Sequence, residues 1–304
     1  MWIDIGQHAF QKWENNHDGY GSFQDLEGAS LEDVRNFHRD YYGPNNAVLS
    51  IAGDVTPAQG FALAKKYFGD IAKRPTPKSG DFSEPLNTAE KRVEQSDTLA
   101  QVPAIAAAWK MPGRGSRDQA PMAVLGELLA GSDASLFYQG IVKGRELALN
   151  VDALYGLTSP WEYDGPTLYT VFFVYKPTTN ADAMLTAMDE EIAKVVKNGV
   201  DDATLKRVKT SMLADWNNSL ESFISRADRL AKLQTLWGDA NVVNKIPSWI
   251  EGVTSADLQR VAKNYLTREN RTVIDRKPVA AAKPAAPAPV AAPAPAPAPA
   301  GAKS

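Results

Sequence analysis

The only imidazoles in this chain are His8, His17 and His38, which makes them the first candidates for metal binding or proton transfer. Glu14 lies between His8 and His17, and the step from Glu14 to His17 has the Glu-x-x-His spacing of di-iron helices. Such a site needs a second copy of the motif, which the sequence lacks. His38 falls on the polar side of an expected helix. We therefore expect surface or loop roles for these residues rather than a metal site.

Other reactive groups also lack the neighbours that catalysis requires. Ser132 stands between a glycine and an aspartate without the spacing of a nucleophile elbow, so we interpret it as part of a turn. The carboxylate pairs Glu190/Glu191 and Asp201/Asp202 are adjacent in sequence. Adjacent side chains point to different faces of a helix or cap it, so we expect solvated charges. The sequence predicts no catalytic residue in this chain.

The composition narrows the class of protein and its partners. The chain has 304 residues, of which 44% are hydrophobic and 23% charged, as is normal for globular domains. A net charge of -3 gives no reason to expect binding to nucleic acid. Because there is no cysteine, disulfides and thiol catalysis are excluded. No apolar stretch approaches the length of about 20 residues that a membrane span needs.

The sequence divides into four parts. Residues 1–74 are expected to be the end of a first domain, and residues 75–97, rich in proline and charge, an interdomain linker. Residues 98–277 form a second domain, and residues 278–304 an Ala/Pro-rich tail without a core.

Within the first part, the patterns predict a helix over 31–42, a short β-type run over 47–53 and a helix that opens at Pro57. In the second domain we expect strands over 105–109, 151–157 and 168–175. Helices are expected over 119–130 and 181–197, and a longer pattern over 205–230 is interrupted at 217–219. Since helices and strands do not alternate strictly, the class is α+β with a sheet layered on helices.

An internal repeat links the two domains. The stretch that begins at Gly28 matches the stretch that begins at Gly252 in its glycine, capping residue, tyrosine and asparagine positions. This predicts two tandem homologous sheet-plus-helix domains, the first incomplete by about 125 residues before Met1. The large apolar residues Trp2, Phe10 and Trp13 near the start are expected to be exposed by that truncation.

Three stretches carry a resemblance to a known family: residues 30–57, 128–156 and 199–216. They resemble the pitrilysin/insulinase family of zinc metallopeptidases. The resemblance implies two similar α+β domains per half, and two halves that close around a polypeptide or peptide substrate. It also implies zinc held by an H-x-x-E-H helix and a distant glutamate, and no such motif occurs here. We therefore expect zinc in the full-length family and no cofactor in this chain.

The family also uses an Arg and a Tyr seven residues apart to bind the substrate carbonyl. The positions in this sequence that match that pair are Val142 and Leu149, neither of which can donate a hydrogen bond. Arg145 is nearby but out of register, so we expect a solvated or salt-bridged side chain. The aromatic strand 169–175 could offer main-chain groups to a peptide, although a core role is favoured.

These observations predict a non-catalytic part of the peptide chamber of a larger zinc peptidase, which needs a complementary half or subunit. The alternative is a non-proteolytic scaffold or assembly subunit of the same fold. By resemblance to exported bacterial relatives, we expect a periplasmic location.

Overall fold

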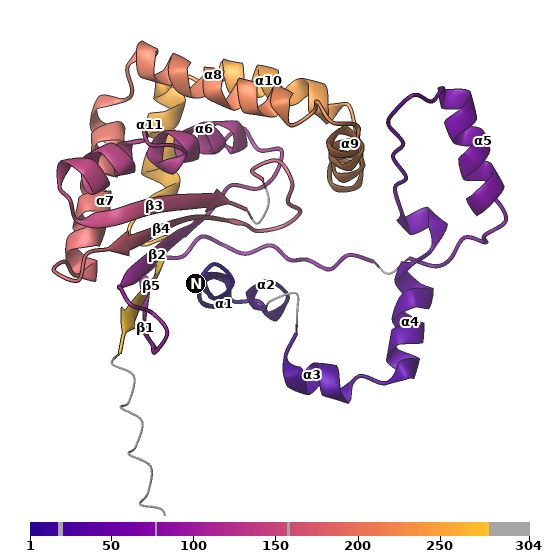
Figure 1. Ribbon diagram of the computed structural model, residues 1–304, viewed down its shortest axis with the longest axis horizontal. Helices are drawn as coiled ribbons and strands as arrows, with labels where there is room; N and C mark the ends of the chain where they lie inside the picture. Colours follow the sequence, from indigo (N-terminus) through magenta and orange to yellow (C-terminus); the bar gives the residue numbers. More distant parts are fainter. Residues whose placement is uncertain (18–20, 77, 157–158, 280–304) are drawn as a thin grey trace, which may run out of the picture.

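The computed structural model describes the chain except for residues 18–20, 77, 157–158 and 280–304. It contains one mixed five-stranded sheet with helices layered against it, which confirms the α+β class (Figure 1). The end of the strand expected at 151–157 and most of the expected tail lie outside the described residues. No helix in the described parts is long and apolar enough to cross a membrane.

The sheet has the strand order β1-β5-β2-β4-β3. Its strands are β1 (Lys91–Asp97), β2 (Ala104–Lys110), β3 (Ala148–Tyr155), β4 (Leu168–Tyr175) and β5 (Arg271–Pro278). β1 and β5 pair in parallel, and the other neighbours are antiparallel. The segment expected as a linker, 75–97, thus contains β1. Its side chains alternate between half-buried and exposed, but most of the half-buried ones are polar, so the sequence shows no alternation of hydrophobic residues.

Helices cover one face of the sheet and enclose the main core (Figure 1). They are α6 (Gln119–Ala130), η2 (Tyr138–Gly144), α7 (Ala181–Asn198), α8 (Asp202–Asn218), α9 (Phe223–Trp237), α10 (Val242–Gly252) and α11 (Ser255–Tyr265). The predicted interruption of the long helical pattern is confirmed, because α8 ends at Asn218 and Ser222 caps the next helix.

The opposite face of the sheet is covered in part by the start of the chain. Ile5 and Ala9 of α1 (Asp4–Ala9) are buried against Ala106 and Ala108 of β2. The alanine methyl groups let the helix approach the sheet closely. The short α2 (Trp13–Asn16) follows α1.

This packing corrects the expectation that three aromatic residues near the start would be exposed. Only Trp13, with 69% of its surface exposed, is open to solvent. The ring of Trp2 lies 5.4 Å from that of Phe172, and the ring of Phe10 lies under the ammonium group of Lys110. Both side chains are therefore half-buried.

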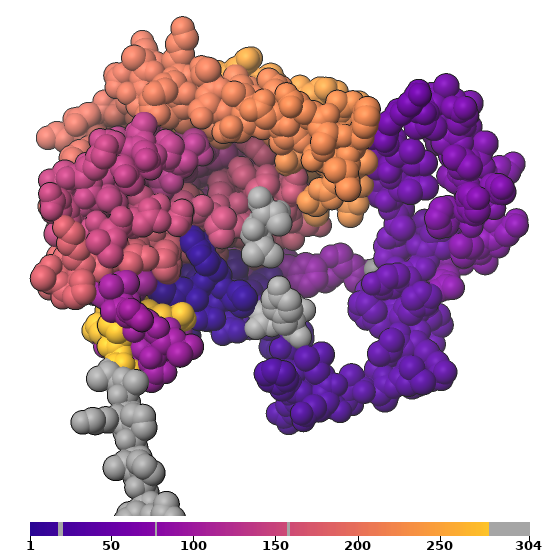
Figure 2. Space-filling view, viewed as in Figure 1, coloured from indigo at the N-terminus to yellow at the C-terminus, as the bar shows by residue number. Residues whose placement is uncertain are grey.

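The next part of the chain forms an arm beside the sheet, defined here as residues 22–76. It carries α3 (Phe23–Gly28), α4 (Leu31–Tyr41), η1 (Pro44–Asn46) and α5 (Pro57–Phe68). Figure 2 shows a hollow between the arm and the rest of the molecule along much of its length. No residue in the helices of the arm is buried.

The β-type run expected at 47–53 is not a strand in the structure, so this prediction is wrong. Its backbone from Ala47 to Ile51 is nevertheless free of helix or turn. A strand needs a neighbour to accept and donate its main-chain hydrogen bonds. Among the described residues, no other strand lies alongside this run.

Candidate functional site

The two positions that match the family's Arg/Tyr pair lie at the junction of η2 and β3. Val142 belongs to η2, a π-helical segment, and its side chain packs against the main core. Leu149 lies at a register shift between Ala148 and Asn150, where β3 bulges away from β4, and 53% of its surface is exposed. Bulges re-aim side chains at sheet edges. The fold therefore presents position 149 to solvent, but with a side chain that cannot hydrogen-bond.

Arg145 lies between these two positions and is held by α7. Its Nη2 is 2.5 Å from the carboxylate of Glu190 and 3.6 Å from that of Glu191. Glu191 also accepts a hydrogen bond from Lys194 at 2.7 Å. The expectation of a salt-bridged Arg145 is thus met by the geometry, and its charge is already balanced.

Glu191 corrects the expectation of a solvated charge, because it is only 4% exposed. Its carboxylate lies over Gly140 of η2, where a Cβ atom would come within 2.5 Å of the carboxylate oxygen. The absent side chain at Gly140 lets the acidic group reach Arg145 and Lys194. Sequence adjacency alone could not reveal this, because the contact joins two separate elements.

The remaining candidate residues have structural roles. Asp201 caps α8 by accepting a hydrogen bond from the amide of Thr204 at 2.9 Å. The Oγ of Ser132 accepts from the amide of Ala134, as expected for a turn. Asp202 lies in the first turn of α8, where its negative charge interacts favourably with the positive end of the helix dipole.

The aromatic strand considered for peptide binding, 169–175, does not have a free edge. It is β4, which pairs with β2 on one side and β3 on the other. Tyr169, Phe173 and Tyr175 are buried in the main core. The strand-addition hypothesis for this segment is therefore wrong, because its main-chain groups are already used, and the core interpretation holds.

Each of the three histidines has a different local environment. The ring of His17 stacks on that of Trp13 at 4.1 Å and bonds to the carbonyl oxygen of Trp13. His38 stacks on Tyr42 at 5.2 Å, and His8 lies in the last turn of α1. Within the described parts of the chain, no three His, Asp or Glu side chains gather as a metal site would need. The described residues therefore do not fit the zinc of the family, and no reaction step is derived through it.

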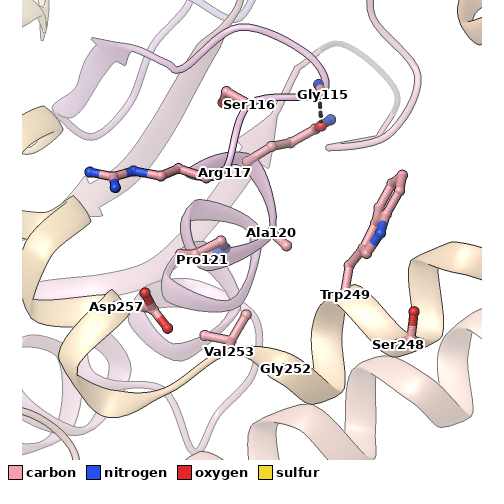
Figure 3. Close-up of a pocket in the computed structure, with 11 residues that line it drawn as sticks. Gly115, Ser116, Arg117, Ala120, Pro121, Ser248, Trp249, Gly252, Val253 and Asp257 are labelled. Carbon is pink, nitrogen blue, oxygen red and sulfur yellow. Dashed lines mark hydrogen bonds between the residues drawn. The ribbon is translucent and has the colours of Figure 1, made fainter.

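A cavity of about 440 Å³ opens where the β2–α6 loop meets α10 and α11 (Figure 3). Trp249 forms one wall, and Arg117 points away from it. Burial opposes ionisation of Asp257, but hydrogen bonds from Thr254 and Arg260 hold its pKa at about 2. Because its carboxylate caps α11 and pairs with Arg260, it is committed to structure. The cavity has the volume of a small-molecule site but presents no catalytic pair.

A buried charge cluster on the opposite face of the sheet was missed by sequence reasoning. Glu84 accepts hydrogen bonds from the backbone amides of Gln11 and Lys12, from the amide of Asn15 and from the ammonium of Lys110. Burial disfavours its charge, yet these donors lower its pKa to about 2. The cluster fixes the start of the chain on the sheet and has no reactive partner.

Comparison with known proteins identifies the family to which this fold belongs. Residues 28–212, more than half of the chain, match the family model described as the Peptidase M16 inactive domain, and the chain belongs to that family. It is 24% identical over 273 residues to the zinc protease PqqE of Helicobacter pylori. It is 26% identical over 256 residues to an uncharacterised zinc protease of Mycobacterium bovis.

These alignments cover 85% and 82% of this chain but only 57% and 56% of the two relatives. The chain thus spans about half the length of the curated relatives it matches. Among solved structures, a Helicobacter pylori protease superposes with a TM-score of 0.80 at 21% identity, over 90% of this chain and 65% of that one.

An M16 inactive domain from Pseudomonas fluorescens superposes with a TM-score of 0.76 at 14% identity, over 93% of this chain and 65% of that one. At such identities the structures show the fold alone. The resemblance to the pitrilysin/insulinase family that the three sequence stretches indicated is confirmed by the match to the family model.

Proposed function

We propose that this chain is a non-catalytic portion of a larger zinc endopeptidase and forms part of the wall of its peptide chamber. The observation that carries the proposal is the pair Val142 and Leu149, which offers no hydrogen-bond donor within an inactive M16 domain. The Arg/Tyr pair and the zinc would then come from a complementary peptidase half or subunit.

The same proposal divides the chain as the sequence suggested. Residues 1–74 would complete a first peptidase-like domain together with further polypeptide, and the sheet domain would form the second. Because β1 pairs with β5 in the sheet and Glu84 accepts a hydrogen bond from Lys110 of β2, we propose that the second domain starts before residue 98.

Peptide hydrolysis in a reconstituted mixture tests the proposal. The full chain is mixed with a zinc-bearing M16 subunit and a quenched fluorescent peptide. We expect no hydrolysis by the chain alone, activity in the mixture above that of the zinc-bearing subunit alone, and loss of activity with a chelator. Val142→Ala and Leu149→Ala should each change that activity less than about twofold, because neither contacts the reacting carbonyl. Failure of the chain to raise hydrolysis would refute the proposal.

The alternative is a non-proteolytic scaffold. It is supported by the similarity to a chain of Complex III2 from Candida albicans, with a TM-score of 0.73 at 13% identity over 90% of this chain. A stable complex that never hydrolyses peptide would favour this function.

For location we propose the periplasm. The periplasmic protease PqqL of Escherichia coli superposes with a TM-score of 0.56 at 15% identity over 75% of this chain. Fractionation of the native host would test it, and recovery of the protein in the cytosolic fraction would refute it.

A further inference from the structure

The cavity where the β2–α6 loop meets α10 and α11 has a rigid aromatic wall. Trp249, on α10, is half-buried, and the centre of its ring lies 5.4 Å from that of Trp237 and 6.2 Å from that of Trp161. The indole of Trp237 donates a hydrogen bond to the carbonyl of Trp161 at 2.9 Å, and only 4% of Trp161 is exposed. The three rings therefore support one another, so little conformational entropy is lost when a ligand packs on Trp249.

The other surfaces of the cavity are formed by small side chains and main chain. Ala120 and Pro121 of α6 lie across the cavity from Trp249, and Val253 lies below them (Figure 3). The β2–α6 loop reaches the cavity at Gly115, whose φ of 75° favours glycine. Because no side chain covers the main chain at this position, the backbone of a ligand can approach it closely.

The charged side chains that line the cavity are not directed at a ligand. The side chain of Arg117 is 80% exposed and points away from the cavity. Asp257 caps α11 and is paired with Arg260. A phosphate, carboxylate or ammonium group in the cavity would therefore lose its hydration without gaining a counter-charge. The cavity favours a ligand that is uncharged at this point.

The indole N–H of Trp249 is a hydrogen-bond donor that the described part of the protein does not use. By contrast, the indoles of Trp109 and Trp237 donate to main-chain carbonyls at 3.0 Å and 2.9 Å. An aromatic ring beside a free N–H suits a segment in the polyproline conformation. Proline rings pack on the aromatic face, and the N–H donates to a carbonyl, which this conformation leaves without an internal hydrogen bond.

The sequence contains a segment with these properties. In the Ala/Pro-rich tail, proline and alanine alternate from Pro293 to Pro299, and this run has no charged residue. Proline fixes φ near −65°, so such a run is extended before it binds and loses little entropy on binding. The alanine side chains are small enough to let the chain lie close to a flat ring. An uncharged run thus matches an uncharged cavity.

The run is tethered within reach of the cavity. The β2–α6 loop follows β2, and Trp109 near the end of β2 pairs with Arg271 at the start of β5. From Arg271 to Pro278, β5 is about 23 Å long at 3.3 Å per residue. The chain from Pro278 to Pro293 spans up to about 46 Å in the polyproline conformation. A short tether gives an effective concentration of about 1 mM, so a weak contact is enough.

We propose that the cavity beside Trp249 is a binding site for a proline-rich segment and that its occupant is the run Pro293–Pro299 of the same chain. The prolines pack on the ring of Trp249, and the indole N–H donates to a carbonyl of the run. The tail then folds back over α10 instead of extending away from β5. The inference goes beyond the proposed function, because the contact requires neither zinc nor a catalytic partner.

Paramagnetic NMR on the full chain tests the inference. The protein has no cysteine, so Ala291→Cys provides a single attachment site for a nitroxide, two residues before the run. The indole resonance of Trp249 is assigned by its absence in Trp249→Phe. We expect the nitroxide to abolish this resonance and its reduction with ascorbate to restore it. The indole of Trp13, which is 69% exposed in α2, should keep its resonance.

A pair of variants on α10 shows whether the label reaches Trp249 through the cavity. Ser248→Arg places a long charged side chain at an exposed lining position and should restore the Trp249 resonance in the labelled protein. Asn244→Arg is the matched control, because Asn244 is exposed about one turn earlier on the same helix and does not line the cavity. This variant should leave the resonance abolished.

A second pair of variants lies entirely in the tail and cannot disturb the sheet domain. Serine at all four prolines of the run, Pro293–Pro299, should restore the Trp249 resonance in the labelled protein. The matched control carries serine at the three prolines between β5 and the run, and the resonance should stay abolished. Loss of the paramagnetic effect in the control as well would contradict the assignment of the run as the occupant.

Three further outcomes would overturn the inference. The first is a Trp249 resonance that the nitroxide leaves intact. The second is a paramagnetic effect that persists in Ser248→Arg, because the label would then approach Trp249 without the run entering the cavity. The third is an effect that appears only as the protein concentration is raised, because a second copy would then supply the tail, whereas a tethered contact does not depend on concentration.

Discussion

Glu84 joins three distant parts of the chain through one carboxylate. Its partners Gln11, Lys12 and Asn15 precede it by 69 to 73 residues, and Lys110 follows by 26. A sequence pattern cannot reveal such a group, because nothing local distinguishes it from other acidic residues near prolines. The role of Arg145 could be predicted from the sequence, because it does not coincide with Val142 or Leu149, the two positions that match the family's Arg/Tyr pair.

Replacing Glu84 with Gln should strongly destabilise the protein. The side chains of Glu84 and Lys110 are 1% and 3% exposed, so the change leaves a buried ammonium without a counter-charge. We expect a loss of about 3–5 kcal/mol in the free energy of unfolding, measured by urea denaturation at pH 7. Glu94→Gln is the control: Glu94 is 75% exposed and pairs with Lys277, so a loss below about 1 kcal/mol is expected. Equal losses in both variants would contradict the assignment.

The same carboxylate should make stability depend on pH. The pKa of Glu84 falls from 4.5 to about 2 in the folded protein. The group therefore contributes stability above about pH 4.5, and that contribution is lost as the pH falls toward 2. Each unit of pKa corresponds to about 1.4 kcal/mol, so the contribution is of the order of 3 kcal/mol. Urea midpoints measured from pH 6 to pH 3 should fall more steeply for the native sequence than for Glu84→Gln.

At the scale of elements, hydrophobic periodicity predicted α6 with its observed bounds and β4 with its observed bounds. It failed at β1, whose half-buried residues are mostly polar, and at 47–53, where the residue types suit a strand but none forms. Hydrophobic periodicity shows which side chains of a segment are suited to burial. Whether it becomes a strand depends on neighbours that are distant in sequence.

Asn46 and Asn270 occupy matching positions of the internal repeat, so they show how much the same residue contributes with and without neighbouring strands. Asn270→Ala removes bonds to Tyr265, Lys110 and the buried amide of Asn87, so it should cost about 2–3 kcal/mol in the free energy of unfolding. Asn46→Ala removes an exposed bond to Tyr41 and should cost less than about 1 kcal/mol. Both variants are compared by urea denaturation of the isolated chain. If the two losses were alike, Asn46 would be as buried as Asn270, contrary to its exposure in the structure.

At the scale of the whole molecule, the resemblance predicted the family correctly, and the assignment of residues 1–74 to a first domain stays a prediction. Nothing in the sequence indicated that α1 packs on β2 of the sheet. This contact depends on Lys91, whose ammonium donates to the carbonyls of His8 and Ala9 at the end of α1. A cation at a helix C-terminus is favourable, but the pairing spans a sequence distance that no local pattern can bridge.

The contrast between a buried sheet and an exposed arm predicts the course of limited proteolysis. Local opening is least costly where few apolar contacts are buried, so the arm, residues 22–76, should be cut before the sheet domain. We expect early cleavage within the arm and survival of a fragment that extends from about residue 84 to 278, identified by mass spectrometry. The segment 1–17 should remain bound to this fragment after cleavage, because Ile5 and Ala9 are buried against β2 and Glu84 holds the amides of Gln11 and Lys12.

The control for this experiment is Glu84→Gln, which should release the 1–17 peptide on size-exclusion chromatography while the arm is cut at the same rate. Arm residues and sheet residues cleaved together would instead mean that the molecule opens as one cooperative unit. In that case the exposed side chains of α4 and α5 would be stabilised by contacts as strong as those of the core, contrary to their exposure in the structure.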